Sequence, residues 1–311
     1  KKIDGSKIHK DDIEFLLNEA KKQLILNDKN QSVIHIFNHN YLVDGKIFIE
    51  EPIDVYANSL THEMTFITTK KNNLKNIKQV FIECDIEVDK FIARTFALGA
   101  ELLNDDELKF GSIIIDLGFE KTSLALFKNF APVHSITFPI GTNHITKDIS
   151  KVCSLSMEES ENIRNNIDFL FQKNNDLFDK DNYLKNNYFV NSNFRKISKN
   201  LVLNIIKARI DEIIDELTKQ LIVPGFNLNS GISLVLEGGS NLKNIKEYFS
   251  NSFGANLKKI EYSLTNDFKR DFSSCLGAIK VIKDGWETEA IPEPVNDNVK
   301  KFSFFGKIFK I

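Results

Sequence analysis

The chain has 311 residues, of which 42% are hydrophobic and 27% charged, enough for the cores of two domains or one large bilobed one. Its net charge of −2 excludes a global basic field, so we expect no binding of nucleic acid. Three scattered cysteines without CxxC spacing indicate free thiols, the histidines form no ligand cluster, and no apolar run is long enough to span a membrane. We therefore expect no metal site and no membrane-spanning helix.

Residues 1–86 predict a small helix-plus-sheet module. Apolar residues recur at helical spacing from Asp11 to Leu24, and Asp44-Gly45 is a hairpin-type turn between two short strands. The other elements expected here are strands at 33–37 and 63–69 and a helix at 73–83. Since the chain begins with Lys1 and its first residues resemble the middle of a domain, we expect an N-terminal truncation.

Residues 87–283 predict an α/β domain. The run at 112–116 is continuously apolar, as in a strand buried on both faces, and strands at 122–127 and 133–138 complete a three-stranded meander. An outer subdomain is expected at about 165–230, although the polar stretch 166–200 predicts no regular element. The remaining predicted elements are a buried strand at 232–236 and helices at 91–103, 144–152, 157–165, 201–221, 242–253 and 273–282.

The chain ends in an acidic linker, 284–299, and a predicted amphipathic helix, 300–311. Phenylalanines and isoleucines fill one face of this helix and lysines most of the other, a pattern typical of a helix that lies in an anionic lipid interface. A terminal helix packed on its own domain is the alternative. The residues expected to contact the membrane are Phe302, Phe304, Phe305, Lys307, Ile308, Phe309 and Lys310.

Two glycine turns that follow buried strands are candidate phosphate sites. Asp116 ends the first strand, Gly118 lets backbone N–H groups approach a phosphate, and Thr122 adds a hydroxyl. An acid at such a strand end can also hold a metal-bound water. Gly238, Gly239 and Ser240 follow the strand at 232–236 and precede a helix, a second place where a nucleotide could approach the backbone. Both patterns also occur as plain turns.

A third candidate is the pair Glu161 and Arg164, which lie one helical turn apart. They could flank a ribose or stack on a purine, although a surface salt bridge is the commoner explanation of such a pair. These features follow the order of an actin-type ATPase lobe: a meander with D-x-G comes first, then helices, and then a strand, two glycines and a helix.

The ordered motifs resemble those of FtsA, the actin homologue of bacterial cell division. Asp116 to Gly118 with Thr122 matches its phosphate hairpin, and Val43-Asp44-Gly45 matches a front-end motif. The amphipathic C-terminus is also the family's ending. The other segments that carry the resemblance are 138–149, 161–164, 208–213 and 236–239.

The resemblance implies an actin-like scaffold rather than an enzyme. It implies self-association into filaments, tethering of FtsZ to the cytoplasmic face of the inner membrane at the septum, and contacts of residues 1–86 with later divisome proteins. It implies that the FtsZ tail docks on the outer subdomain, where Arg195 and Arg209 are candidates because guanidinium groups pair well with carboxylates.

The resemblance also implies ATP and Mg²⁺ as cofactors, but two departures predict weak or no nucleotide binding by this chain. The family's first phosphate hairpin is absent, and Phe119-Glu120 replaces glycines in the second. Glu120 places a negative charge near the expected phosphates, which Lys121 partly offsets. Two other functions remain possible: an actin-type ATPase or kinase, and a pilus-assembly actin-like adaptor.

Overall fold

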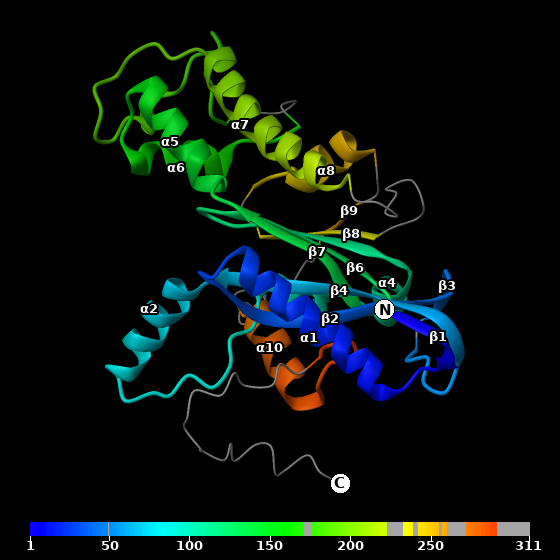
Figure 1. Cartoon of the computed structure of the whole chain (residues 1–311). Helices are drawn as coiled ribbons and strands as arrows, with labels where there is room; N and C mark the ends of the chain where they lie inside the picture. Colours follow the sequence, from blue (N-terminus) through cyan, green and yellow to red (C-terminus); the bar gives the residue numbers. More distant parts are fainter. Residues whose placement is uncertain are drawn as a thin grey trace.

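The computed structural model describes residues 1–48, 50–170, 176–222, 233–238, 242–254, 257–259 and 272–290. Within these residues two sheets form the framework: an N-terminal sheet with strand order β1-β4-β2-β3 and a central sheet with order β7-β6-β5-β8-β9. Figure 1 shows the central sheet between a group of helices on one side and the N-terminal sheet with its helices on the other. The predicted α/β class is therefore confirmed.

The N-terminal sheet is antiparallel, and β2 and β4 form its longest strand pair. Asp44 and Gly45 both have positive φ, 48° and 80°, so the predicted hairpin turn is confirmed. Helix α1 packs Ile13 with Ile3, Ile8 and Leu60 in a small core. The elements are β1 (Lys2–Lys7), α1 (Lys10–Asn27), β2 (Gln31–Val43), β3 (Lys46–Phe48), β4 (Tyr56–Lys70) and α2 (Lys71–Ile82).

The central sheet contains the predicted meander. Every residue of β5 (Ser112–Leu117) is buried, as its continuous apolar run predicts. Strands β6 (Thr122–Lys128) and β7 (Ala131–Phe138) follow antiparallel to it. On the other side of β5, strand β8 (Ser233–Gly238) runs parallel, and β9 (Leu257–Lys259) pairs with β8. Because β5 and β8 are parallel, their carboxyl ends meet at one edge.

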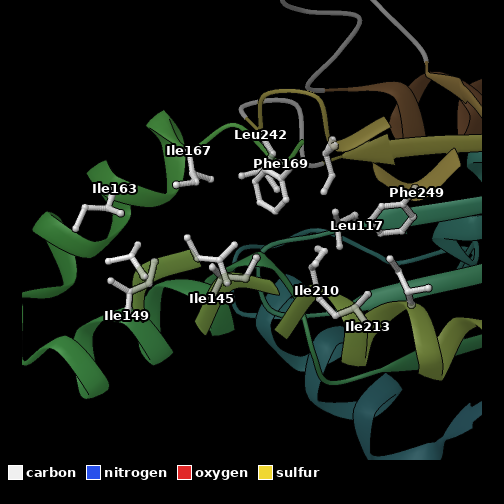
Figure 2. Packing of buried hydrophobic residues seen from close by; sticks show 14 of the residues in the cluster. Leu117, Ile145, Ile149, Ile163, Ile167, Phe169, Ile210, Ile213, Leu242 and Phe249 are labelled. Carbon is white, nitrogen blue, oxygen red and sulfur yellow. The ribbon is translucent and has the colours of Figure 1, made fainter. Parts of the chain in front are cut away.

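One face of the central sheet is covered by the helices α5, α6, α7 and α8 (Figure 1). Their apolar stripes converge on Leu117 of β5, and Ile145, Ile210 and Phe249 point into the same core (Figure 2). This core fixes the positions of the loops at the carboxyl edge of the sheet. The elements are α5 (Thr142–Cys153), α6 (Met157–Asn166), η1 (Asn186–Tyr188), α7 (Lys199–Gln220) and α8 (Ile245–Phe253).

The other face of the central sheet is covered by α3 (Arg94–Leu102) and α10 (Ser273–Asp284), with α4 (Asp105–Phe110) beside them. Helices α3 and α10 cross very closely at Gly277, where a Cβ atom would lie 1.8 Å from the carbonyl oxygen of Ala97. Thus only glycine fits at this crossing, which fixes the N-termini of the two helices relative to each other.

Residues 286–290 join the N-terminal sheet to the central sheet. The Trp286 ring N–H donates to the Phe130 carbonyl oxygen at 2.7 Å, and Ala290 N–H donates to the carbonyl oxygen of Ile36 in β2 at 2.9 Å. The Glu289 carboxylate meets the buried His35 Nδ1 at 2.6 Å. The part of the predicted linker up to Ala290 is therefore bonded to the body of the protein.

Four short elements among the described residues escaped the sequence prediction: β1, α4, η1 and β9. Strand β1 is mostly polar, with Ile3 alone buried, and it is a strand because it pairs with β4. Helix α4 is too short for apolar periodicity, but its capping box from Asn104 to Glu107 was readable. The predicted membrane helix, 300–311, and the rest of the predicted linker, 291–299, lie outside the described residues.

Candidate nucleotide site at the carboxyl edge of the central sheet

The structure brings the three sequence candidates to one edge of the central sheet. In the parallel pairing of β5 with β8, Asp116 lies opposite Glu237 and Leu117 lies opposite Gly238. Asp168, just after α6, forms an isolated β-bridge with Lys243, just before α8. This bridge joins the helix that carries Glu161 and Arg164 to the segment that follows β8. Gly239 and Ser240 lie outside the described residues.

Asp116 is held in an ion pair with Arg94, the first residue of α3. The Arg94 Nε donates to Asp116 Oδ2 at 2.6 Å and a terminal nitrogen donates to Oδ1 at 3.3 Å. The carboxylate is buried, while the arginine side chain is 56% exposed. Sequence reasoning missed Arg94. Its partner Asp116 lies 22 positions further along the chain, so no local pattern signalled the pair.

The glycine turn after β5 is fastened to the N-terminus of α5. Gly118 N–H donates to the Lys121 carbonyl oxygen at 3.0 Å, which closes the turn. Thr142 N–H then donates to the carbonyl oxygen of Gly118 at 3.0 Å, and Asn143 N–H to that of Phe119 at 2.8 Å. The first amides of α5, which would otherwise face an anion, are therefore bonded to the hairpin.

Thr122 and Glu120 also bond within this unit. The buried Thr122 hydroxyl donates to the Ile140 carbonyl oxygen at 2.6 Å, so it braces the segment before α5. The Glu120 carboxylate accepts from the Asn143 amide at 2.5 Å and from Lys147 Nζ at 3.0 Å. These two hydrogen bonds lower the pKa of Glu120. The cation that the structure places beside Glu120 is thus Lys147, whereas the sequence analysis assigned this role to Lys121.

Arg164 connects α6 to the same hairpin. Its guanidinium donates to Glu161 Oε1 at 2.8 Å and to the Thr146 hydroxyl at 3.0 Å, and it lies 5.7 Å from the centre of the Phe119 ring. Burial lowers the pKa of Arg164, and the Glu161 charge opposes this shift. The pair is therefore more than a surface salt bridge, because one partner is buried against the phosphate hairpin.

The charges at this edge are largely neutralised in pairs: Asp116 with Arg94, Glu120 with Lys147 and Glu161 with Arg164. The phosphates of a nucleotide at this edge could pair with the guanidinium groups of Arg94 and Arg164 and with Lys121. Mg²⁺ needs carboxylate oxygens, and both oxygens of Asp116 already accept from Arg94. In the part of the chain that the structure describes, no group of three His, Cys, Asp or Glu side chains could hold a metal ion. Asp116, as its described contacts leave it, therefore does not fit Mg²⁺ unless Arg94 is displaced.

The two arginines predicted to meet an acidic peptide have different surroundings. Arg209 on α7 bonds Asp148 at 2.6 Å and also pairs with Glu212, and the Asp148 hydrogen bond raises its pKa. Arg195 is exposed and donates to the Ser154 carbonyl oxygen just after α5. We call the surface formed by Arg195 and the exposed side chains of Val152, Val190 and Phe194 the outer patch.

Glu159 organises the outer patch and was missed by sequence reasoning. Its buried carboxylate accepts from the Ser192 hydroxyl at 2.6 Å and from the backbone N–H groups of Ser156, Asn191 and Ser192 at 2.7–2.9 Å. Burial alone would raise the pKa of Glu159, but these bonds outweigh it and lower the pKa to about 2. The sequence signal for Glu159 was the capping box from Ser156 to Glu159. The contact of Glu159 with residues 191–192 could not be predicted from the sequence.

Comparison with known proteins gave one consistent family. The model described as "Cell division protein FtsA" matches residues 113–277, and the model of the SHS2 domain inserted in FtsA matches residues 1–68. The chain is 24% identical over 238 residues to FtsA of Agrobacterium fabrum, covering 76% of this chain and 53% of the relative. It is 25% identical to FtsA of Buchnera aphidicola from Acyrthosiphon pisum over 99% of this chain and 74% of the relative. Thus the chain spans about half the length of several relatives that it matches.

Two solved structures support the fold alone. The MreB5 protein of Spiroplasma citri bound to AMPPNP has a TM-score of 0.52 at 21% identity, covering 70% of this chain and 66% of that one. The PilM–PilN type IV pilus biogenesis complex has a TM-score of 0.57 at 13% identity, with 88% and 72% covered. These likenesses confirm an actin-like fold.

Proposed function

Because the chain belongs to the FtsA family of actin-like cell-division proteins, we propose that it is a division scaffold that tethers FtsZ to the membrane. The observation that carries this proposal is the match of both the central domain, 113–277, and the inserted module, 1–68, to models specific to FtsA. An ATPase or kinase of the same fold would not need the inserted module. The pilus adaptor shares the fold, but the family models that match are those of FtsA.

The proposed membrane contact is the C-terminal amphipathic helix. No helix in the described ranges combines the length and apolar character needed to cross a bilayer. One short amphipathic helix binds lipid weakly, so stable attachment would come from many copies in a filament. In this proposal the protein acts at the cytoplasmic face of the inner membrane, at the septum, and self-association is part of its function.

The proposed FtsZ contact is the outer patch. Apolar side chains there are widely exposed, with Val190 at 71% and Phe194 at 57%, and Arg195 supplies a cation that an acidic peptide needs. Arg209 is a weaker candidate, because a peptide carboxylate would have to compete with Asp148 and Glu212. Other divisome proteins would bind through the N-terminal module.

We expect weak ATP binding and no fast hydrolysis. The first α5 amides are bonded to the hairpin, and the acids at the edge are paired with cations. The carboxylates of Asp116, Glu120 and Glu161 are therefore not free to activate a water. In this proposal the nucleotide lobe is chiefly a structural element of a scaffold, and a submicromolar ATP affinity would contradict that view.

Two binding assays on the whole chain test the proposal. Co-sedimentation with vesicles that contain anionic lipid should be lost on deletion of residues 302–311, while binding of an FtsZ tail peptide should persist. Arg195→Glu should weaken the peptide at least about tenfold, since it reverses a charge at the contact, and leave vesicle binding intact. Lys128→Glu, on the exposed end of β6, is the matched charge reversal and should change neither. Unchanged vesicle binding after the deletion would refute the membrane role.

A further inference from the structure

A guanidinium group contacts the buried carboxylate of Asp116 at the carboxyl edge of β5. Arg94 contacts both Asp116 oxygens, and its remaining terminal nitrogen donates to the Ser274 hydroxyl at 2.9 Å. The arginine thus joins the end of β5 to the first turns of α3 and α10. A metal ion could reach the Asp116 carboxylate only by displacing these contacts.

The scaffold around Arg94 keeps it in this position. Arg94 and Ser274 stand at the N-termini of α3 and α10, and the close crossing at Gly277 fixes the spacing of these helices. Lys280 strengthens the crossing by donating to the Ala100 carbonyl oxygen at 2.7 Å. The N-terminus of α3 lies beside the buried Asp116 and favours its negative charge.

We propose that Arg94 takes the place of a divalent cation at this edge, so that a nucleotide bound here is bound without Mg²⁺. A bidentate guanidinium group satisfies the carboxylate geometrically and presents its charge where phosphate oxygens would approach. Arg94 is then the residue that determines the cation requirement of the site. This inference rests on the proposed nucleotide site, and it concerns only which cation neutralises the charge of a nucleotide bound there.

The test measures ATP binding to the whole chain by calorimetry, once with Mg²⁺ and once with EDTA. Wild-type affinity should change by no more than about twofold between the two conditions. In Arg94→Gln, which frees Asp116, Mg²⁺ should strengthen ATP binding at least about tenfold, because the carboxylate then becomes a metal ligand. Lys109→Gln, an exposed lysine on α4, is the control and should behave as wild type.

A parallel Mn²⁺ titration, followed by electron paramagnetic resonance, separates the cation from the nucleotide. Mn²⁺ should bind more tightly to Arg94→Gln than to wild type, because Asp116 is free to be one of its ligands only in the variant. A wild-type protein that loses ATP affinity tenfold or more in EDTA overturns the proposal even if the variant does not fold. A folded Arg94→Gln protein that binds Mn²⁺ no more tightly than wild type also overturns it. ATP that binds in neither condition overturns the nucleotide site itself, and the Mn²⁺ result then decides the role of Arg94.

Discussion

Substitution of Gly141 by alanine should separate the phosphate hairpin from α5. A Cβ atom at this position would lie 2.5 Å from the Phe119 oxygen, 2.6 Å from the Gly118 oxygen and 2.7 Å from the Lys121 nitrogen. All three are backbone atoms of the hairpin, so no side chain can move aside. Relief to an ordinary contact requires the hairpin and the helix to part by about 1 Å.

The expected cost combines two terms. Overpacking of this kind costs about 1–3 kcal/mol, and the two hydrogen bonds from Thr142 and Asn143 to the hairpin contribute about 1 kcal/mol each. We therefore expect Gly141→Ala to lower the free energy of unfolding by about 3–5 kcal/mol.

Urea denaturation at equilibrium measures this change. Lys151→Ala, an exposed position in the last turn of the same helix, is the control and should change the free energy by less than about 0.5 kcal/mol. A Gly141→Ala protein as stable as the control would refute the inferred contact between hairpin and helix.

Three further predictions concern other parts of the molecule. Glu159→Ala leaves buried backbone donors unpaired and should lower the free energy of unfolding by about 3 kcal/mol, whereas the exposed Glu158→Ala should change it little. The pKa of Glu159 is about 2 in the folded protein and 4.5 ordinarily, so the carboxylate stabilises the fold above pH 4.5 and this stabilisation is lost as the pH falls toward 2. In an acid titration, Glu159→Gln should therefore lose less stability than wild type. Trp286→Ala removes the hydrogen bond to Phe130 and the edge contact with Phe96, so it should lower the free energy of unfolding by about 2 kcal/mol in thermal denaturation. It should also make residues 286–290 susceptible to limited proteolysis. Unchanged protease resistance would contradict the role of these residues in joining the two sheets. Phe309→Glu puts a charge on the predicted lipid face and should detach the protein from anionic vesicles, whereas Lys310→Arg should bind as wild type.

Periodicity and turn chemistry were sufficient for most elements of the fold. The continuous apolar run of β5 is typical of a strand buried on both faces, and Asp44-Gly45 is typical of a tight turn; both predictions are confirmed. Short polar elements such as β1 were not predicted, because their structure comes from the strand they pair with and leaves no periodic signal.

At the candidate site, the sequence identified the residues but not their partners. Asp116, Gly118 and Arg164 were named from motifs, and the structure places all three at one edge of the sheet. Their charges and amides, however, are bonded to residues far away in the chain: Arg94 to Asp116, and Thr142 to Gly118. No local pattern reports such a bond, because it depends on how α3 and α5 pack against the sheet.

The sequence by itself determined the family and the order of most elements, because these depend on residue types and their spacing. Only the tertiary structure decided how the charges at the sheet edge are satisfied. A buried carboxylate such as Asp116 must find a partner when it loses water, and that partner is the cation that folding brings within reach. Here it is Arg94, the first residue of α3.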